Sequence, residues 1–280
     1  MPFIGVLPER RHLFQPEPRQ NLAVSDAAAW RLNPRHRRVY DKLSLALDAG
    51  LLAAPCGVDP ADFGIAGDTR LFVKPITNLA GMGLDARCAR ADAIPMAPGN
   101  FWCERLTGTH TSSDCLVRDG AAIWFAHTRA SAEKDAERPV YWQIGADLPD
   151  EEAWLRRWVS ENLVGYTGLC NLELIGGRPI EGHLRGSNGF FDFYGPDFIP
   201  AWVALVDGEP FDVPPAIPGG YVISIFGDAD LSDDNLRAAA AAGVDVQLDR
   251  HTRGRSAILR CTDRQAGFES YRRLTGRRLI

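Results

Sequence analysis

Two acidic residues on either side of a glycine pair are the feature that most constrains how this chain folds. The stretch Asn171–Arg185 reads NLELIGGRPIEGHLR, and its Gly176-Gly177 pair is typical of a tight β-hairpin turn. If Gly176–Arg178 forms a three-residue loop, Glu173 lies directly opposite Glu181 on one face of the hairpin. A two-residue Gly-Gly loop would instead place the two acids on opposite faces, because side chains alternate along a strand.

The three-residue loop would create a pair of facing carboxylates. Like charges directly opposite each other destabilise a sheet, so this pattern usually needs a cation. Proteins hold Mg²⁺ through one or two carboxylates together with substrate phosphates. The same register places His183 opposite Asn171. An ordinary surface hairpin with solvated acids would also explain the pattern, and the stretch alone leaves both interpretations open.

The composition indicates a globular protein. The 280 residues are 45% hydrophobic and 24% charged, and the net charge of −5 argues against general binding to nucleic acid. No apolar run approaches the roughly 18 residues that a membrane helix needs, and the first residues do not read as a signal peptide. The six cysteines form no CxxC pair, so neither a zinc cage nor a disulfide framework is expected. We therefore expect a cytoplasmic protein with no membrane and no nucleic-acid partner.

Lysine is rare in this chain, and the positions of the few lysines are informative. Of the 31 basic residues only three are lysines, Lys42, Lys74 and Lys134, and arginine supplies the other 28. Lysine is a compact point charge on a flexible stem, which suits a phosphate oxygen that needs no bidentate partner. The scarcity indicates that these positions need lysine itself, although a codon-biased genome with leftover lysines would give the same count.

Hydrophobic periodicity and turn residues predict a mixed α+β chain. Predicted strands cover residues 3–7, 71–73, 101–106, 113–117, 122–127, 221–226, 244–248 and 257–261. Predicted helices cover residues 35–49, 150–161, 232–242 and 264–274, after a short Ala-rich piece begun by Ser25 or Asp26. The polar segment 131–138 is expected to be a mobile loop. After a Pro-rich joint at 212–220, strands and helices alternate, which predicts a small C-terminal α/β unit.

Four segments, taken in order, resemble the ATP-grasp enzymes, the group that contains biotin carboxylase, carbamoyl-phosphate synthetase and D-alanine ligase. The segments read YDKLSLALDAGLLAAP, LFVKP, ERLTGTHTSSDCLVRDG and NLELIGGRPIEGHLR, and the resemblance covers roughly residues 33–195. It implies an ATP-grasp fold, in which two α+β subdomains grip the nucleotide. The implied organisation is a reduced N-terminal segment (1–32), an ATP-grasp domain (33–211) with a lid subdomain at roughly 70–130, and a small C-terminal α/β subdomain (220–280).

The resemblance implies that lysines and glycines bind the phosphates of ATP. Lys42 would reach the phosphates from its helix, and Lys74 would contact the α- and β-phosphates from its strand. Lys134 corresponds to a lid lysine that touches the γ-phosphate. Gly81 and Gly83 stand where a flexible glycine loop closes over the phosphates, a place where backbone N–H groups approach closely.

The nucleoside would be recognised at the junction of the two subdomains. Glu104, Arg105 and Leu106 match the hinge whose backbone contacts the adenine edge. His110 takes the position where the family usually has a ribose-binding Glu. An imidazole can also hydrogen-bond a hydroxyl, so His110 is the expected ribose contact.

The same resemblance places the metal and the reaction centre on the acidic hairpin. Glu173 and Glu181 would be ligands for one or two Mg²⁺ ions. His183 replaces the family's usual Asn ligand, and a neutral imidazole is less suited to Mg²⁺ than an amide oxygen. Arg185 matches the arginine that steadies the transferring phosphoryl group or the acyl-phosphate.

The implied activity is an ATP- and Mg²⁺-dependent ligase. A carboxylate attacks the γ-phosphate to form an acyl-phosphate, and an amine or a thiol then displaces phosphate. A phosphoryl transferase of the kinase type and a non-catalytic ATP-binding regulatory subunit are the alternatives. The partners would be a small-molecule carboxylate and a nucleophile. Familiar members have a Rossmann-like substrate domain before the first of these segments, where only some 32 residues precede Asn33 here. Either that domain is reduced, or the C-terminal subdomain or a partner supplies its role, and a homodimer or a partner subunit is among the expected partners.

Two further features leave their roles open. The aromatic stretch GFFDFYG at 189–195 is expected in the core or in the wall of a substrate pocket. The arginine-rich stretches 251–255 and 272–278 are expected to be solvated faces, and binding of an anionic substrate is the alternative.

Overall fold

Two β-sheets of different size organise the part of the chain that the computed structural model describes, residues 2–81, 83–135, 138–187, 189–215, 217–249, 252 and 254–279. The large sheet has eight antiparallel strands in the order β13-β12-β7-β8-β11-β14-β16-β15. Their bounds are β7 His110–Arg118, β8 Ala121–Ala130, β11 Tyr141–Ile144, β12 Gly168–Ile175, β13 Arg178–His183, β14 Gly220–Phe226, β15 Asp245–Leu248 and β16 Arg255–Cys261.

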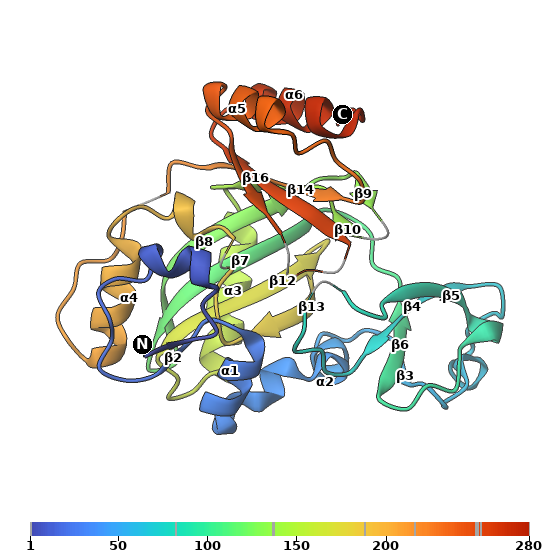
Figure 1. Ribbon diagram of the computed structural model, residues 1–280. Helices are drawn as coiled ribbons and strands as arrows, with labels where there is room; N and C mark the ends of the chain where they lie inside the picture. The colour runs from blue at the N-terminus through green and yellow to red at the C-terminus, as the bar shows by residue number, and fades with distance from the viewer. Residues whose placement is uncertain are drawn as a thin grey trace.

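The small sheet projects to one side of the large one (Figure 1). Its strands, in the order β3-β6-β4-β5, are β3 Ala53–Pro55, β6 Asn100–Glu104, β4 Arg70–Pro75 and β5 Arg87–Arg90. Two strand pairs complete the β-structure: the parallel β1 (Phe3–Ile4) and β2 (Leu22–Ala23), and the antiparallel β9 (Lys134–Asp135) and β10 (Arg138–Pro139).

Six α-helices and five 3₁₀ turns connect and cover the sheets in the described residues. The α-helices are α1 Asp26–Leu32, α2 Lys42–Asp48, α3 Pro149–Asn162, α4 Phe198–Asp207, α5 Asp233–Ala241 and α6 Arg264–Thr275. The 3₁₀ turns are Pro8–Leu13, Pro34–Tyr40, Pro60–Phe63, Ala91–Ala93 and Phe191–Phe193. No helix in the described ranges is both long enough and apolar enough to cross a lipid bilayer.

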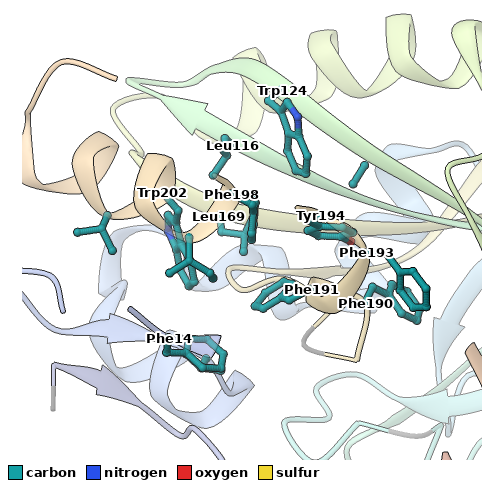
Figure 2. Close-up of a cluster of buried hydrophobic side chains, with 14 of the residues drawn as sticks. Phe14, Leu116, Trp124, Leu169, Phe190, Phe191, Phe193, Tyr194, Phe198 and Trp202 are labelled. Atoms are coloured by element: carbon teal, nitrogen blue, oxygen red, sulfur yellow. The ribbon is translucent and has the colours of Figure 1, made fainter. Parts of the chain in front are cut away.

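One face of the large sheet carries an aromatic core (Figure 2). Leu116 on β7 and Trp124 on β8 pack there against the aromatic stretch 189–195 and against Phe198 and Trp202 of α4. This aromatic stretch was expected in the core or in a pocket wall, and the structure shows both: the stretch belongs to this core, and its Phe190 also lines a cavity. Helix α4 was not predicted, because FIPAWVALVD is an almost continuous short apolar run, and such a run cannot be assigned to a helix or a buried strand from its pattern alone.

Helices cover the opposite face of the same sheet. Leu155 and Val159 of α3 pack on the β7 and β12 side chains, and α5 and α6 pack on β14 and β16 around Ile223 and Leu259. Strand β14 also pairs with β11, so the predicted C-terminal unit continues the large sheet while having its own small core.

The structure differs from three sequence-based boundaries. The predicted helix over 35–49 is a 3₁₀ turn followed by α2, because Asp41 breaks the helical backbone and caps α2 through Ser44 N at 2.9 Å. The small sheet spans residues 53–104, and β7 and β8 belong to the large sheet, so the segment 70–130 that was expected to form a lid is divided between the two sheets. The segment 131–138 contains β9 and the start of β10, with residues 136 and 137 outside the described ranges.

Candidate active site

A cavity of about 900 Å³ is lined by residues of both the small and the large sheet. Eleven of the thirteen predicted site residues line it: Lys42, Lys74, Gly83, Glu104, Arg105, Leu106, His110, Lys134, Glu173, Glu181 and Arg185. Gly81 lies in the same loop as Gly83, and His183 is buried behind the wall at 2% exposure. The fold therefore brings together side chains that are separated by as many as 143 positions, from 42 to 185.

The acidic hairpin has the predicted register. Glu173 on β12 lies directly opposite Glu181 on β13, and Asn171 lies opposite His183. The two carboxylates therefore share one face of the sheet, the face that borders the cavity.

The predicted three-residue loop is wrong. Ile175 pairs with Arg178, so the loop is the two-residue Gly176-Gly177, with both glycines at positive φ (57° and 74°). The register shifts after Glu173, where the extra residue Ile180 forms a β-bulge. The bulge restores the facing of the two acids that a regular two-residue hairpin would have destroyed.

The hairpin loop also fixes the position of the predicted adenine hinge. Gly176 N–H donates to the carbonyl of Thr109 at 2.9 Å, and a Cβ on Gly176 would collide with the carbonyl of Thr107. Glu104, at the start of the hinge, is held by two hydrogen bonds to Leu52. Its backbone N–H donates to the carbonyl of Leu52 at 3.0 Å, and its side-chain Oε1 accepts from the N–H of Leu52 at 3.1 Å. Glycine at 176 thus lets the hinge and the carboxylates meet at one end of the cavity.

Each carboxylate of the pair contacts a basic side chain. Glu181 Oε1 lies 2.6 Å from Nζ of Lys42, a side chain with only 6% exposure. His110 Nε2 donates to Glu173 Oε2 at 3.1 Å, and Lys134 Nζ lies 3.4 Å from the other nitrogen of the His110 ring. His110 therefore contacts the predicted metal ligand Glu173 in addition to lining the cavity.

Lys74 forms a hydrogen bond with the backbone of the bulge. Its Nζ donates to the carbonyl of Ile180, the bulged residue, at 2.9 Å. Burial lowers the pKa of Lys74, and the positive charge of Lys42 acts in the same direction, while Glu181 opposes it. A buried lysine beside a second lysine gains strongly from a bound anion, because the anion replaces the lost hydration.

An aspartate that sequence reasoning did not single out as a site residue holds the far side of the hairpin. Asp26, the first residue of α1, accepts two hydrogen bonds from Arg185 at 2.8 and 3.0 Å and lies 2.8 Å from His183 Nδ1. Burial raises the pKa of Asp26, but Arg185 and His183 outweigh it and hold the pKa well below its usual range. The only signal in the sequence was the helix start at Ser25 or Asp26, and nothing connected it to residues more than 150 positions away.

Comparison with known proteins gives matches only at the level of structure. No family model and no curated protein matches the sequence. L-amino acid ligase from Bacillus licheniformis superimposes with a TM-score of 0.60 over 88% of this chain and 74% of that chain, at 15% identity. N5-carboxyaminoimidazole ribonucleotide synthetase from Thermus thermophilus superimposes with a TM-score of 0.61 over 90% of this chain and 79% of that chain, at 14% identity. The biotin carboxylase domain of Hydrogenobacter thermophilus 2-oxoglutarate carboxylase, in complex with MgADP, ADP and bicarbonate, gives 0.56 over 85% and 67%, at 11% identity.

The chain has the ATP-grasp fold. The fold predicted from four short segments is thereby confirmed. We call the cavity between the small and large sheets the cleft, and the acidic hairpin forms part of its wall.

The donor atoms in this ATP-grasp cleft fit Mg²⁺ in part. Glu173 and Glu181 offer facing carboxylate oxygens, and the buried Oδ1 of Asn171, two residues before Glu173, has no hydrogen-bond partner in the described chain. Oxygen donors are those that Mg²⁺ prefers. The Nδ1 atom of His183 instead contacts Asp26, and its Nε2 atom lies 3.6 Å from Glu181 Oε1. No cluster of three or more His, Cys, Asp or Glu side chains in the described residues could hold a metal by itself. Substrate phosphates and water would have to complete the shell.

Lys74→Met is expected to weaken ATP binding by roughly 10- to 100-fold, because it removes a charge-assisted contact from a buried site. Isothermal titration with ATP in the presence of Mg²⁺ measures the change. Arg70→Ala, at an exposed position on the same strand β4, is the matched control and should bind ATP normally. Unchanged affinity in Lys74→Met would remove Lys74 from the phosphate site.

Acid is expected to destabilise the ligand-free fold through Glu173. Burial raises the pKa of Glu173, but the hydrogen bond from His110 and the nearby positive charges outweigh it and lower the pKa from 4.5 to about 2. Between these two pKa values the native state binds fewer protons than the unfolded state. The contribution of Glu173 to the free energy of unfolding is therefore complete above pH 4.5 and is lost as the pH falls toward 2. The loss should reach up to about 3 kcal/mol. Urea denaturation at stepped pH should show a shallower pH dependence for Glu173→Gln, and equal slopes would contradict the assignment.

Proposed function

We propose that this chain is an ATP- and Mg²⁺-dependent ligase that joins a carboxylate to an amine or thiol through an acyl-phosphate. One observation carries the proposal: all three lysines of a chain with 31 basic residues line the same cavity as the two facing carboxylates. Phosphoryl transfer is catalysed mainly by alignment and charge neutralisation, and lysines suit phosphate oxygens. The ligases and carboxylases that share the fold support the same class of reaction.

The roles of the residues follow from their positions in the cleft. Lys42, Lys74 and Lys134 bind the phosphates, and the backbone of the hinge 104–106 binds the adenine edge. Glu173 and Glu181 would hold Mg²⁺, which would supply positive charge to neutralise the transferring phosphoryl group. His183 remains only a predicted ligand.

The reaction needs no covalent enzyme intermediate. An oxygen of the substrate carboxylate attacks the γ-phosphorus, and ADP leaves. The nucleophile then attacks the carbonyl carbon, and inorganic phosphate leaves. Arg185, which Asp26 orients through two hydrogen bonds, stabilises the negative charge of the acyl-phosphate.

Hydroxylamine provides a test that does not require the natural nucleophile. The protein is incubated with ATP, Mg²⁺, hydroxylamine and pools of carboxylic acids, and ADP, phosphate and hydroxamate are measured. Ligation predicts acid-dependent release of all three in equal amounts. ADP with a phosphorylated product and no free phosphate would favour the kinase alternative, and ATP binding without turnover for any pool would favour a regulatory subunit.

A further inference from the structure

The cleft extends beyond the residues that the proposed reaction uses. Past Ser187 and Trp142 its wall continues to Ser224 and Phe226 on β14, and two arginines line this end, Arg138 on β10 and Arg255 on β16. Arg255 belongs to the arginine-rich stretch 251–255, of which His251 and Arg253 lie outside the described residues. We call this part of the cleft the distal end.

Among the described residues, the side chains that line the distal end include two arginines and no carboxylate. The three carboxylates among the described residues that line the cleft, Glu104, Glu173 and Glu181, lie on β6, β12 and β13, away from β14 and β16. Asp135 and Asp249 pair with the distal arginines but are not among the residues that line the cleft. A ligand that enters this end meets guanidinium groups and aromatic surface, a combination that favours an anionic group.

The two arginines are held in different ways. Arg255 Nε lies 2.6 Å from Asp249 Oδ2, and its Nη2 donates to Thr252 Oγ1 at 3.1 Å, so that guanidinium is fixed by its own ion pair. Arg138 instead stacks on the ring of Phe226, with its Cζ 3.9 Å from the ring centroid, and its contacts to Asp135 are long, at 3.4 Å. Stacking fixes the plane of the guanidinium. Nε and Nη2 of Arg138 are directed to Asp135, whereas Nη1 makes no hydrogen bond to the described residues and is left to face a ligand.

We propose that the acid substrate is elongated and carries a second anionic group, which Arg138 binds at the distal end. This inference rests on the proposed function, because the reacting carboxylate must lie near Glu173, Glu181 and Arg185. Strands β12 and β14 are separated by β7, β8 and β11, which corresponds to about 19 Å at ordinary strand spacing. Trp142 and Phe190, with ring centroids 5.9 Å apart, lie along this path and would contact the apolar middle of the substrate.

Binding of a dicarboxylate series tests the proposal without any turnover. Calorimetric titrations use the full chain with Mg²⁺ and a non-hydrolysable ATP analogue, and the probes are α,ω-dicarboxylates from succinate to dodecanedioate with their monomethyl esters. The longer diacids should bind roughly 10- to 100-fold more tightly than their esters, which lack the second charge. Arg138→Gln should abolish this preference and leave binding of the ATP analogue unchanged.

Arg118→Gln is the matched control, because Arg118 also stacks on a phenylalanine, Phe211, but does not line the cleft. Arg138→Lys keeps the positive charge but removes the planar guanidinium that stacks on Phe226. This variant should retain part of the preference for diacids over their esters, and its binding would show that the fold tolerates a change at this position. Equal affinity of diacids and esters, no binding of any diacid, or a preference that survives Arg138→Gln would each overturn the proposal. The hydroxylamine assay is separate: a preference for diacids without acid-dependent ADP release would reject the ligase and leave the distal anion site standing.

Discussion

Asp26→Ala is expected to lower the free energy of unfolding by about 3 to 5 kcal/mol, the cost of leaving a buried charge without its partner. Asp26 is 6% exposed and is hydrogen-bonded to Arg185 and 2.8 Å from His183, so its removal strands a guanidinium that is itself only 17% exposed. Urea denaturation with the slope compared between variants measures the loss.

The solvent-exposed ion pair between Arg38 and Asp48 provides the control for the buried Asp26–Arg185 pair. Arg38 Nη2 also contacts both oxygens of its aspartate, at 2.9 and 3.2 Å, but these side chains are 70% and 49% exposed. Asp48→Ala should therefore cost less than about 1 kcal/mol. The double variant Asp26→Ala/Arg185→Ala should be less destabilised than Asp26→Ala alone, because no unpaired charge remains. A cost below about 1 kcal/mol for Asp26→Ala would show that Arg185 is solvated in solution.

Local patterns in the sequence pointed to residues that the fold brings to one cavity. The scarcity of lysine singled out Lys42, Lys74 and Lys134, and all three line this cavity, because a rare residue type is informative wherever it occurs. The expected facing of Glu173 and Glu181 is also observed, but it was derived from a three-residue loop that the structure does not have, and it depends on the bulge at Ile180.

The same reasoning failed where the structure depends on long-range packing. The bulge at Ile180 cannot be read from GGRPIEG, because a regular hairpin and a bulged one share the same turn residues. In the structure the carbonyl of the bulged Ile180 accepts a hydrogen bond from Lys74, 106 positions away, a contact that no local pattern can show. Asp26 and Arg185 are separated by 159 positions, and α4 is so apolar that its short sequence does not distinguish a helix from a buried strand.

Glu181→Gln is expected to reduce ATP-dependent turnover by about a thousand-fold or more, because one neutral side chain removes a proposed Mg²⁺ ligand and half of a carboxylate pair. The amide can still accept a hydrogen bond from Lys42, which lies 2.6 Å from Glu181 Oε1, so the fold should persist. ADP release measures turnover, and thermal denaturation checks folding.

A second measurement separates metal binding from a general loss of activity. Titration of ATP with and without Mg²⁺ should show that wild-type affinity depends on the metal and that this dependence largely disappears in Glu181→Gln. Glu161→Gln, an exposed carboxylate on α3, should behave as wild type in both assays. This prediction depends on the bulge at Ile180. A regular two-residue hairpin would turn Glu181 to the other face of the sheet, whereas the observed register places it opposite Glu173. Wild-type turnover and metal dependence in Glu181→Gln would therefore mean that the facing carboxylates are structural and that Mg²⁺ binds elsewhere.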